Sequence, residues 1–330
     1  MTNIAPYRGA VERDIKTDTR AHWKTRPVVR IISVLGKCYF TLASSSKNVN
    51  NQMRRGKLMF VSHPFPLFVP ADRPERFAKA IAARPDAVLI DLEDAVARRL
   101  KVEARGSLVS ALHADELGLA ILLRINAEGD AEHDADLAVA ADLPLAGIVL
   151  PKTERVETIK RVAAKTGKHV IALVETARGL ANVEAIAENV VQIAFGSIDF
   201  AADLAMQHTQ AALHYARARI VLASRLAGIA APLDGVTTAV HDADIFACDC
   251  AHSLEMGFGG KLLIHPNQIS LARRAFAPSE ADVTWAHRVL TAEGAGAALI
   301  DGAMVDAPVF ARARQVLARH ALAATEDRQP

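Results

Sequence analysis

Cysteine is scarce in this chain, which carries three in 330 residues: Cys38, Cys248 and Cys250. The spacing of Cys248 and Cys250 is too tight for a disulfide framework, and no CxxC or Cys/His pattern typical of a zinc site is present. Free thiols are typical of a reducing compartment, so the sequence favours a cytoplasmic protein.

Long apolar runs are also missing. A membrane span needs roughly 18 consecutive apolar residues. The nearest approach, Val28 to Ser46, is interrupted by Arg30 and Lys37. The sequence therefore predicts no transmembrane helix and no membrane partner.

Net charge is small, at +2, but it is unevenly distributed. Residues 1–60 hold 12 Lys and Arg against 3 Asp and Glu, which leaves 27 basic and 34 acidic residues in the remainder. A mildly acidic globular part argues against a nucleic-acid partner.

The first 60 residues are basic and lack a sustained hydrophobic period. Three interpretations are open: a disordered basic arm, an organelle-targeting segment, or a start codon placed too far upstream, with the true start near Met53 or Met59. The first and third are favoured because no amphipathic arginine-rich helix is visible. Residues 1–60 are accordingly predicted to be an extension outside the globular fold.

From about residue 66, short apolar runs alternate with helical patterns, in a chain that is 51% hydrophobic. Strands that alternate with helices predict parallel pairing, and eight strands close a (β/α)8 barrel. We therefore predict an α/β fold with a TIM barrel over residues 66–278 and a C-terminal helical extension over 279–330. An open doubly wound sheet is the alternative, but no glycine-rich phosphate loop follows the first strand. The predicted strands are Leu67–Pro70, Ala87–Asp94, Ala120–Asn126, Gly147–Lys152, Val170–Thr176, Gln192–Phe200, Ala231–Val236 and Lys261–Pro266.

Polar residues occur at the end of nearly every predicted strand. Glu175 ends the run that begins at Val170, and Asp199 ends the next run. Barrel enzymes carry their chemistry at the carboxyl ends of the strands. Two carboxylates there could hold one hard divalent cation and leave positions open for substrate. The alternative is that both acids are solvated residues at helix starts.

Eight motifs follow one another along the chain: LFVPADRPERFAKA, DAVLIDLEDAV, LLRIN, LPKTE, ALVETARG, FGSIDFAADL, GKLLIHPNQI and GAMVDAPV. Together they resemble the citrate lyase β-subunit-like and malyl-CoA lyase family of the HpcH/HpaI aldolase superfamily, over roughly residues 66 to 320. The resemblance implies a barrel that uses Mg²⁺ to make or break a carbon–carbon bond between an acyl thioester and an oxo acid.

By position, the resemblance implies that Glu175 and Asp199 bind Mg²⁺ and that Arg124 binds substrate oxygens. Arg124 has an alternative role in a structural ion pair with Glu93 or Asp94, and the two roles can coexist.

The resemblance also covers three further residues, whereas His265 and Lys152 are interpreted from their own chemistry at the strand ends. Glu93, Asp94 and Pro70 are implied to support or contact the substrate. His265, at the end of the last predicted strand, is expected to be a structural hydrogen-bonding residue rather than a catalytic one. Lys152 could form a Schiff base, but a carboxylate pair able to bind metal makes this the weaker interpretation.

Asp306, in the motif MVDAP, matches an aspartate that many members of the family deliver from a neighbouring subunit as an acid or base. The resemblance therefore implies a homo-oligomer, a trimer or hexamer, with shared sites. The alternative is that Asp306 caps a helix that starts near Pro308.

The resemblance, together with the residues at the strand ends, implies a Mg²⁺-dependent lyase that cleaves a β-hydroxyacyl-CoA thioester, of the citramalyl-CoA or malyl-CoA type, into an acyl-CoA and an oxo acid by retro-Claisen chemistry. One alternative is a metal-dependent aldolase for free 2-keto-hydroxy acids. Another is the citryl-carrier subunit of a citrate lyase complex. A barrel that serves only as a binding partner is disfavoured because both acids and the arginine are present.

Overall fold

The computed structural model describes residues 30–34, 37–41, 60–112, 119–293, 298–300 and 303–326. The chain divides into two compact units, Met1–Arg54 and Arg55–Pro330. In the smaller unit, β1 (Arg30–Val34) and β2 (Lys37–Thr41) form an antiparallel hairpin. Most of residues 1–60 lie outside the described part of the chain, so the interpretation of this segment stays a prediction.

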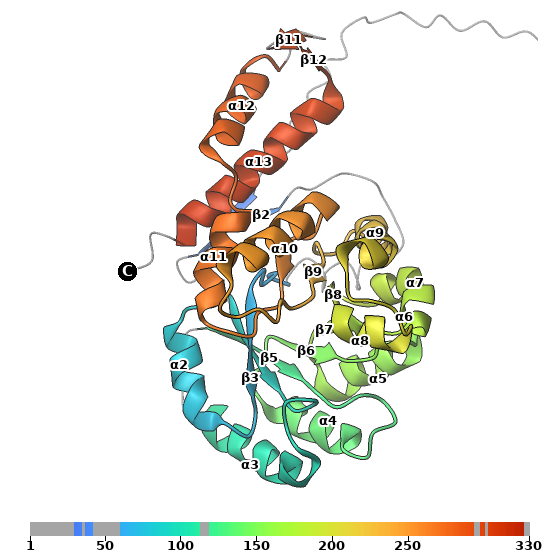
Figure 1. Ribbon diagram of the computed structural model, residues 1–330. Coiled ribbons are helices and arrows are strands. Elements are labelled where there is room, and N and C mark those ends of the chain that lie inside the picture. Colours follow the sequence, from blue (N-terminus) through green and yellow to red (C-terminus); the bar gives the residue numbers. More distant parts are fainter. Residues whose placement is uncertain are drawn as a thin grey trace, which may run out of the picture. The chain divides into compact units, whose positions relative to one another are not determined.

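The larger unit is built around eight strands, each paired in parallel with the next along the chain (Figure 1). A parallel bridge between Leu67 and Leu263 brings the end of the sheet back to its first strand, and Phe68 N–H donates to Leu263 O at 2.8 Å. The predicted (β/α)8 barrel is therefore confirmed. Its strands are β3 (Pro66–Pro70), β4 (Ala87–Asp91), β5 (Ala120–Arg124), β6 (Gly147–Leu150), β7 (Val170–Val174), β8 (Gln192–Phe195), β9 (Leu233–Asp234) and β10 (Gly260–Lys261).

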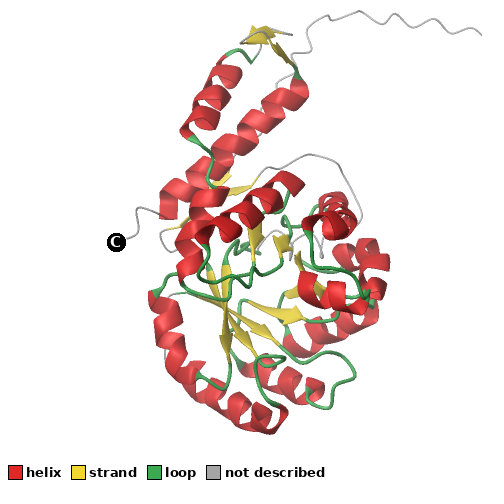
Figure 2. Ribbon diagram, viewed as in Figure 1, coloured by secondary structure: helices red, strands yellow, loops and turns green. Residues whose placement is uncertain are grey.

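Helices lie around the outside of this ring (Figure 2). Within the described residues, no helix is long and apolar enough to cross a membrane. The barrel helices are η1 (Pro74–Arg76), α2 (Phe77–Ala82), η2 (Arg98–Leu100), α3 (Lys101–Leu112), α4 (His133–Asp142), α5 (Val156–Thr166), α6 (Ala177–Ala181), α7 (Val183–Glu188), α8 (Ser197–Asp203), α9 (Gln210–Ala227), α10 (Ala243–Met256) and α11 (Asn267–Phe276).

The strands are buried on both faces, and alternate residues belong to two different clusters. Leu89, Leu122 and Leu173 belong to the cluster that fills the barrel interior. Their neighbours Val88 and Ile90 belong to the larger cluster between strands and helices. A strand with both faces covered needs aliphatic residues at nearly every position, which explains the continuous apolar runs in the sequence.

The predicted strand containing Asp199 is too long. β8 ends at Phe195, and α8 begins at Ser197, so Asp199 lies in the first turn of a helix. Phe200 misled the prediction because it is apolar, yet it is buried as a helical residue whose ring meets Phe195 edge-on at 5.5 Å. The last two strands are also shorter than predicted, with two residues each.

The C-terminal extension has a small core of its own. α12 (Glu280–Thr291) packs on α13 (Ala307–Glu326) through buried residues that include Val289, Phe310 and Val316. A short hairpin of β11 (Ala298–Ile300) and β12 (Ala303–Val305) connects the two helices. Asp306 lies between β12 and α13.

Removing residues 1–58, so that the chain starts at Met59, should leave the melting temperature and activity nearly unchanged. The shortened chain keeps Phe60, whose ring lies 5.5 Å from that of His169, and Ser62, whose hydroxyl accepts a hydrogen bond from Gln192. Thermal melting and activity of both proteins check this. A second truncation that also removes Phe60 and Ser62 should melt lower, and a large loss of soluble protein from the first truncation would contradict the prediction.

Candidate active site

Alternation along the strands aims polar side chains into the mouth of the barrel. Leu89 and Leu122 point inward, so the residues two positions later, Asp91 and Arg124, do so as well. The strand register sets Pro70 beside Asp91, and Asp91 beside Arg124. Three neighbouring strands thus end at one level with a proline, an acid and an arginine.

Asp91 is the main partner of Arg124. The guanidinium donates to both carboxylate oxygens of Asp91 at 2.7 Å, and its third nitrogen lies 3.1 Å from Glu93 and 3.7 Å from Asp94. The ring of Phe68 lies 5.0 Å from the centre of this group. Burial opposes the charged form of Arg124, but the bonds and charge of Asp91, followed by Glu93 and Asp94, outweigh it and raise its pKa. Arg124 is therefore a fixed, permanently charged group.

Asp91 also shapes the loop that carries the other two acids. Its carboxylate accepts hydrogen bonds from Glu93 N–H at 2.9 Å and from Ala95 N–H at 3.0 Å. One carboxylate thus fixes both Arg124 and the backbone of the LEDA segment, and this explains why Glu93 and Asp94 lie beside the arginine.

Glu175 follows β7 and is 1% exposed. Its Oε1 accepts a hydrogen bond from the backbone N–H of Lys152 at 2.8 Å. Its Oε2 is buried and has no hydrogen-bond partner among the described residues. Burial, followed by the charge of Glu93 and with a smaller contribution from Asp199, raises the pKa of Glu175 to about 8 against the opposing effect of Lys152.

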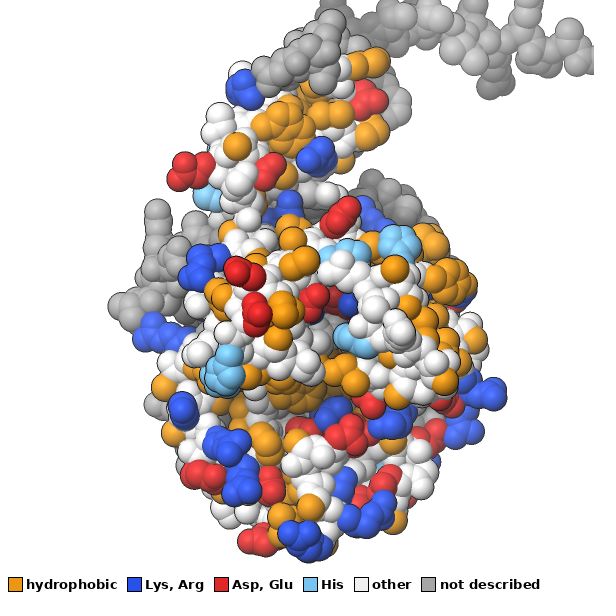
Figure 3. Space-filling view, viewed as in Figure 1, with side chains coloured by type: hydrophobic (Ala, Val, Ile, Leu, Met, Phe, Trp, Pro, Cys, Tyr) orange, Lys and Arg blue, Asp and Glu red, His pale blue; other side chains and the backbone are white. Residues whose placement is uncertain are grey.

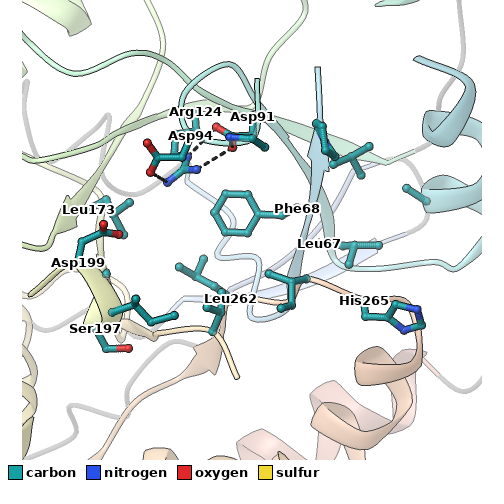
Figure 4. Close-up of a pocket in the computed structure, with 18 of the residues that line it drawn as sticks. Leu67, Phe68, Asp91, Asp94, Arg124, Leu173, Ser197, Asp199, Leu262 and His265 are labelled. Atoms are coloured by element: carbon teal, nitrogen blue, oxygen red, sulfur yellow. Dashed lines mark hydrogen bonds and ion pairs between the residues drawn. The ribbon is translucent and has the colours of Figure 1, made fainter. Parts of the chain in front are cut away.

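A pocket of about 730 Å³ collects these groups: Glu175, Asp199, Arg124, Asp91 and Asp94 all line it. In the space-filling view, hydrophobic side chains lie in a hollow on this face, with acidic and basic side chains beside it (Figure 3). The close-up shows Arg124, Asp91 and Asp94 together on one side and His265 at the opposite edge from Asp199 (Figure 4).

The acid pair fits a divalent cation. A carboxyl oxygen buried without a partner is costly unless a cation or a proton satisfies it, and Glu175 Oε2 has no partner among the described residues. The charge of Asp199 acts on Glu175, and both acids line the same pocket. Within the described residues, no group of three or more His, Cys, Asp and Glu side chains could hold a metal. A two-carboxylate site suits Mg²⁺, which keeps several waters or substrate oxygens in its shell.

Comparison with known proteins agrees with this geometry. A family model described as HpcH/HpaI aldolase/citrate lyase matches residues 65–266. The chain belongs to this family. It is 32% identical to a (3S)-malyl-CoA thioesterase of Cereibacter sphaeroides, over 78% of this chain and 95% of that protein. It is 30% identical to a mitochondrial citramalyl-CoA lyase of Rattus norvegicus, over 76% of this chain and 84% of that protein.

The fold is similar to a solved structure of protein CitE from Mycobacterium tuberculosis in complex with magnesium, acetoacetate and coenzyme A. That match has a TM-score of 0.72 and 35% identity, and it covers 80% of this chain and all of the other. The family suggested by the sequence motifs is thus confirmed, together with the barrel.

The structure brings most of the predicted site residues of this family member together. Pro70, Asp94, Arg124, Glu175 and Asp199 line one pocket. Glu93 is not among the described residues that line this pocket, but it bridges Arg124 and Lys152, with separations of 3.1 Å and 2.6 Å. These residues have the placement that the predicted roles require, and their roles stay predictions.

Two other polar residues near the ends of predicted strands make structural contacts. Asp234 is buried against Arg217, Ser253 and Lys261, outside the pocket lining, so it is a structural acid. His265 lines the pocket edge, where its Nδ1 accepts a hydrogen bond from the N–H of Asn267 at 3.2 Å.

Lys152 does not have the environment of a Schiff-base lysine. Although burial lowers its pKa, the hydrogen bond and charge of Glu93, followed by Glu175, raise it overall. A charged ammonium cannot attack a carbonyl, so the alternative of a Schiff base loses its support.

Asp306 is not among the described residues that line this pocket. It stands at the start of α13, where its carbonyl accepts from Phe310 N–H at 3.0 Å and its carboxylate is 3.4 Å from Val309 N. This is the cap position that the alternative interpretation expected. The carboxylate is exposed, so capping leaves it accessible.

Sequence reasoning missed two contributors. Asp91 falls inside the predicted strand Ala87–Asp94 and was not identified as the partner of Arg124. Gly196 was overlooked, although a Cβ there would lie 2.3 Å from Glu175 Oε2. The signal for Asp91 was available, because a residue two positions after the inward-facing Leu89 must also face inward.

Glu175→Gln should stabilise the metal-free protein increasingly as pH rises. Because the pKa of Glu175 is about 8 in the fold and ordinarily 4.5, the folded state holds a proton that the unfolded chain releases. The stability due to this proton is complete below the unfolded pKa and is lost as pH rises through the folded pKa. Glutamine is neutral throughout, so the melting temperature of the variant should gain on wild type between about pH 5 and pH 8.5.

Melting curves in EDTA across this range provide the measurement. Glu157→Gln, which changes an exposed glutamate on α5, is the matched control and should show no such gain. If the melting temperatures of wild type and Glu175→Gln changed with pH in the same way, the raised pKa of the buried Glu175 would be contradicted.

Proposed function

We propose that this protein is a Mg²⁺-dependent carbon–carbon lyase that cleaves a β-hydroxyacyl-CoA thioester of the citramalyl-CoA or malyl-CoA type. The single observation that carries the proposal is the buried oxygen of Glu175, unpartnered among the described residues and part of a pocket that also contains Asp199 and Arg124. A buried acid without a partner is costly, so its presence beside Asp199 and Arg124 favours a site that uses a cation in catalysis.

The side chains in the pocket suggest separate roles for the cation and for Arg124. Bound at Glu175 and Asp199, Mg²⁺ would supply Lewis-acid stabilisation of the substrate hydroxyl as it becomes the ketone of the oxo acid. Arg124 would hold the oxyanion that develops on the thioester fragment. It suits this role because Asp91 fixes its orientation through two hydrogen bonds of 2.7 Å, and a fixed donor needs no reorganisation during the reaction.

A proton must then reach the carbon freed by cleavage. Asp306 is the proposed donor, delivered from a neighbouring copy, since in its own chain it starts α13 and does not line the pocket. This requires a homo-oligomer, for which we propose a trimer or hexamer. The low cysteine content supports a cytoplasmic location.

The named relatives support a CoA thioester as substrate, and they also raise a second candidate. A relative called a (3S)-malyl-CoA thioesterase favours hydrolysis of the thioester at a similar site. Another, called a citramalyl-CoA lyase, favours cleavage of the carbon–carbon bond, as does the family description. We favour cleavage because Arg124 and the acid pair fit the charges that it develops.

Purified protein incubated with Mg²⁺ and a panel of hydroxyacyl-CoA esters separates the two reactions. Carbon–carbon cleavage yields an oxo acid and a new acyl-CoA without free thiol. Hydrolysis yields free CoA thiol and no oxo acid. We expect oxo acid and acyl-CoA in equal amounts. Free thiol without oxo acid would contradict the proposed lyase activity and support a thioesterase instead. Free 2-keto-hydroxy acids and a citryl-carrier substrate belong in the same panel, because they test the remaining alternatives.

A further inference from the structure

The two oxygens of the Glu175 carboxylate have opposite surroundings. Oε1 accepts the backbone N–H of Lys152 at 2.8 Å, and Lys152 Nζ lies 3.8 Å away from the same oxygen. Oε2 is buried with no partner among the described residues. The rotation of the carboxylate is therefore fixed from one side, and a single oxygen is left for a ligand.

The backbone of Lys152 is held in an unusual conformation to make this contact. Its φ is +45°, in the left-handed region that residues with a side chain seldom adopt. Residues held in that region tend to occur at functional sites, where the surrounding structure imposes the conformation. The turn after β6 thereby directs the N–H of Lys152 at Glu175.

Gly196 leaves the space on the other side. An ideal Cβ at this position would lie 2.3 Å from Glu175 Oε2 and 2.5 Å from Glu175 Cβ. The φ of Gly196 is −84°, which any residue can adopt, so the backbone conformation does not require glycine. Glycine is required because the carboxylate occupies the volume that a side chain would fill.

We infer that the Lys152 backbone and Gly196 together preset Glu175 to bind a divalent cation through one oxygen, Oε2. Both are positioning residues, since each acts through Glu175. The inference rests on the proposed cation site and adds how that site is held ready before the cation arrives. Groups behind metal ligands typically change affinity by about 10- to 100-fold when they are altered.

The first test measures Mn²⁺ and Mg²⁺ binding to EDTA-treated protein by titration calorimetry, without substrate. Gly196→Ala should weaken the cation Kd by about 10- to 100-fold, because its methyl displaces the carboxylate. Gly106→Ala is the matched control, since a Cβ there meets nothing within 4 Å. A folded Gly196→Ala protein with the wild-type Kd would overturn the inference.

The second test isolates the backbone of Lys152 and does not depend on Gly196→Ala folding. Lys152→Gly and Lys152→Val both remove the ammonium, but valine, being β-branched, disfavours the left-handed conformation that glycine accepts. Lys152→Val should bind Mn²⁺ about tenfold more weakly than Lys152→Gly. Equal Kd values for the two variants would overturn the inference.

Arg84 supplies the control for this pair, because it is also a long basic residue with a left-handed φ of +52° and it does not line the pocket. Arg84→Gly and Arg84→Val should share the wild-type cation Kd. If wild-type protein itself bound neither cation, the proposed function would fail along with the inference. If wild-type protein bound the cations and no Gly196 or Lys152 variant bound them more weakly, the inference would be overturned but the proposed function would not.

Discussion

Asp199→Asn is expected to reduce Mg²⁺-dependent cleavage by about 10³-fold, equivalent to about 4 kcal/mol of transition-state stabilisation. Asn keeps the size of the side chain but removes the charge that a hard cation needs. Because Asp199 is only half-buried and lies on the first turn of α8, the fold should tolerate the change. Circular dichroism and melting temperature should therefore match wild type while kcat/KM falls.

The same helix provides a matched control. Asp203 is exposed at the end of α8, and its carboxylate accepts a hydrogen bond from Ala177 N–H at 2.7 Å. Asp203→Asn keeps that acceptor and should keep full activity. Undiminished turnover of Asp199→Asn, or wild-type turnover that survives EDTA, would rule out the metal site as drawn.

The barrel could be predicted from the sequence because two of its features are local: the aliphatic strands and the polar residues at their ends. Strands buried on both faces must be aliphatic throughout, and the runs at Ala87, Gly147 and Val170 show this directly. The polar residue that ends each run is visible in the same way. The positions of Glu175 and Arg124 at the barrel mouth therefore follow from the order of residues along each run.

Details that depend on contacts between distant residues were beyond the sequence. The surroundings of the Glu175 carboxylate come from two other strand ends: Lys152 N–H bonds Oε1, and Gly196 has no side chain to fill the space at Oε2. Asp199 was assigned to a strand because period alone cannot distinguish a short buried strand from the start of a buried helix. The glycine at position 196 was the available signal, since β8 stops beside it.

Asp234 shows a second limit of the sequence. It ends β9, much as Glu175 follows β7, but Arg217 and Lys261 lie beside it. Burial would raise the pKa of Asp234, and the charges of Lys261 and Arg217 outweigh burial and lower it. The sequence shows that an acid ends a strand, but not which cations the fold places around it. An acid can bind a cation only where one of its oxygens is left without such a partner, as Oε2 of Glu175 is among the described residues.

Mixing two inactive variants should restore activity if Asp306 acts in a neighbouring subunit. Asp306→Asn subunits keep the acid pair, and Glu175→Gln subunits keep Asp306. Unfolding and refolding the two together forms hybrids in which some sites combine an intact barrel with an intact aspartate. For random assembly of equal amounts of the two variants in a closed ring, about a quarter of the sites should be complete.

The choice of substitutions separates catalysis from folding. Asparagine is as good a helix cap as aspartate, so Asp306→Asn should preserve the start of α13 while removing the proton donor. A mixture of Glu175→Gln with Asp199→Asn is the matched control, because every barrel in it lacks one of the two acids and no site can be complete. We expect activity to return in the first mixture and not in the second, because Asp306 of one subunit then completes the site in the barrel of another. Hybrids shown by mass spectrometry to have formed, yet still inactive, would mean that Asp306 acts in its own chain or only caps its helix.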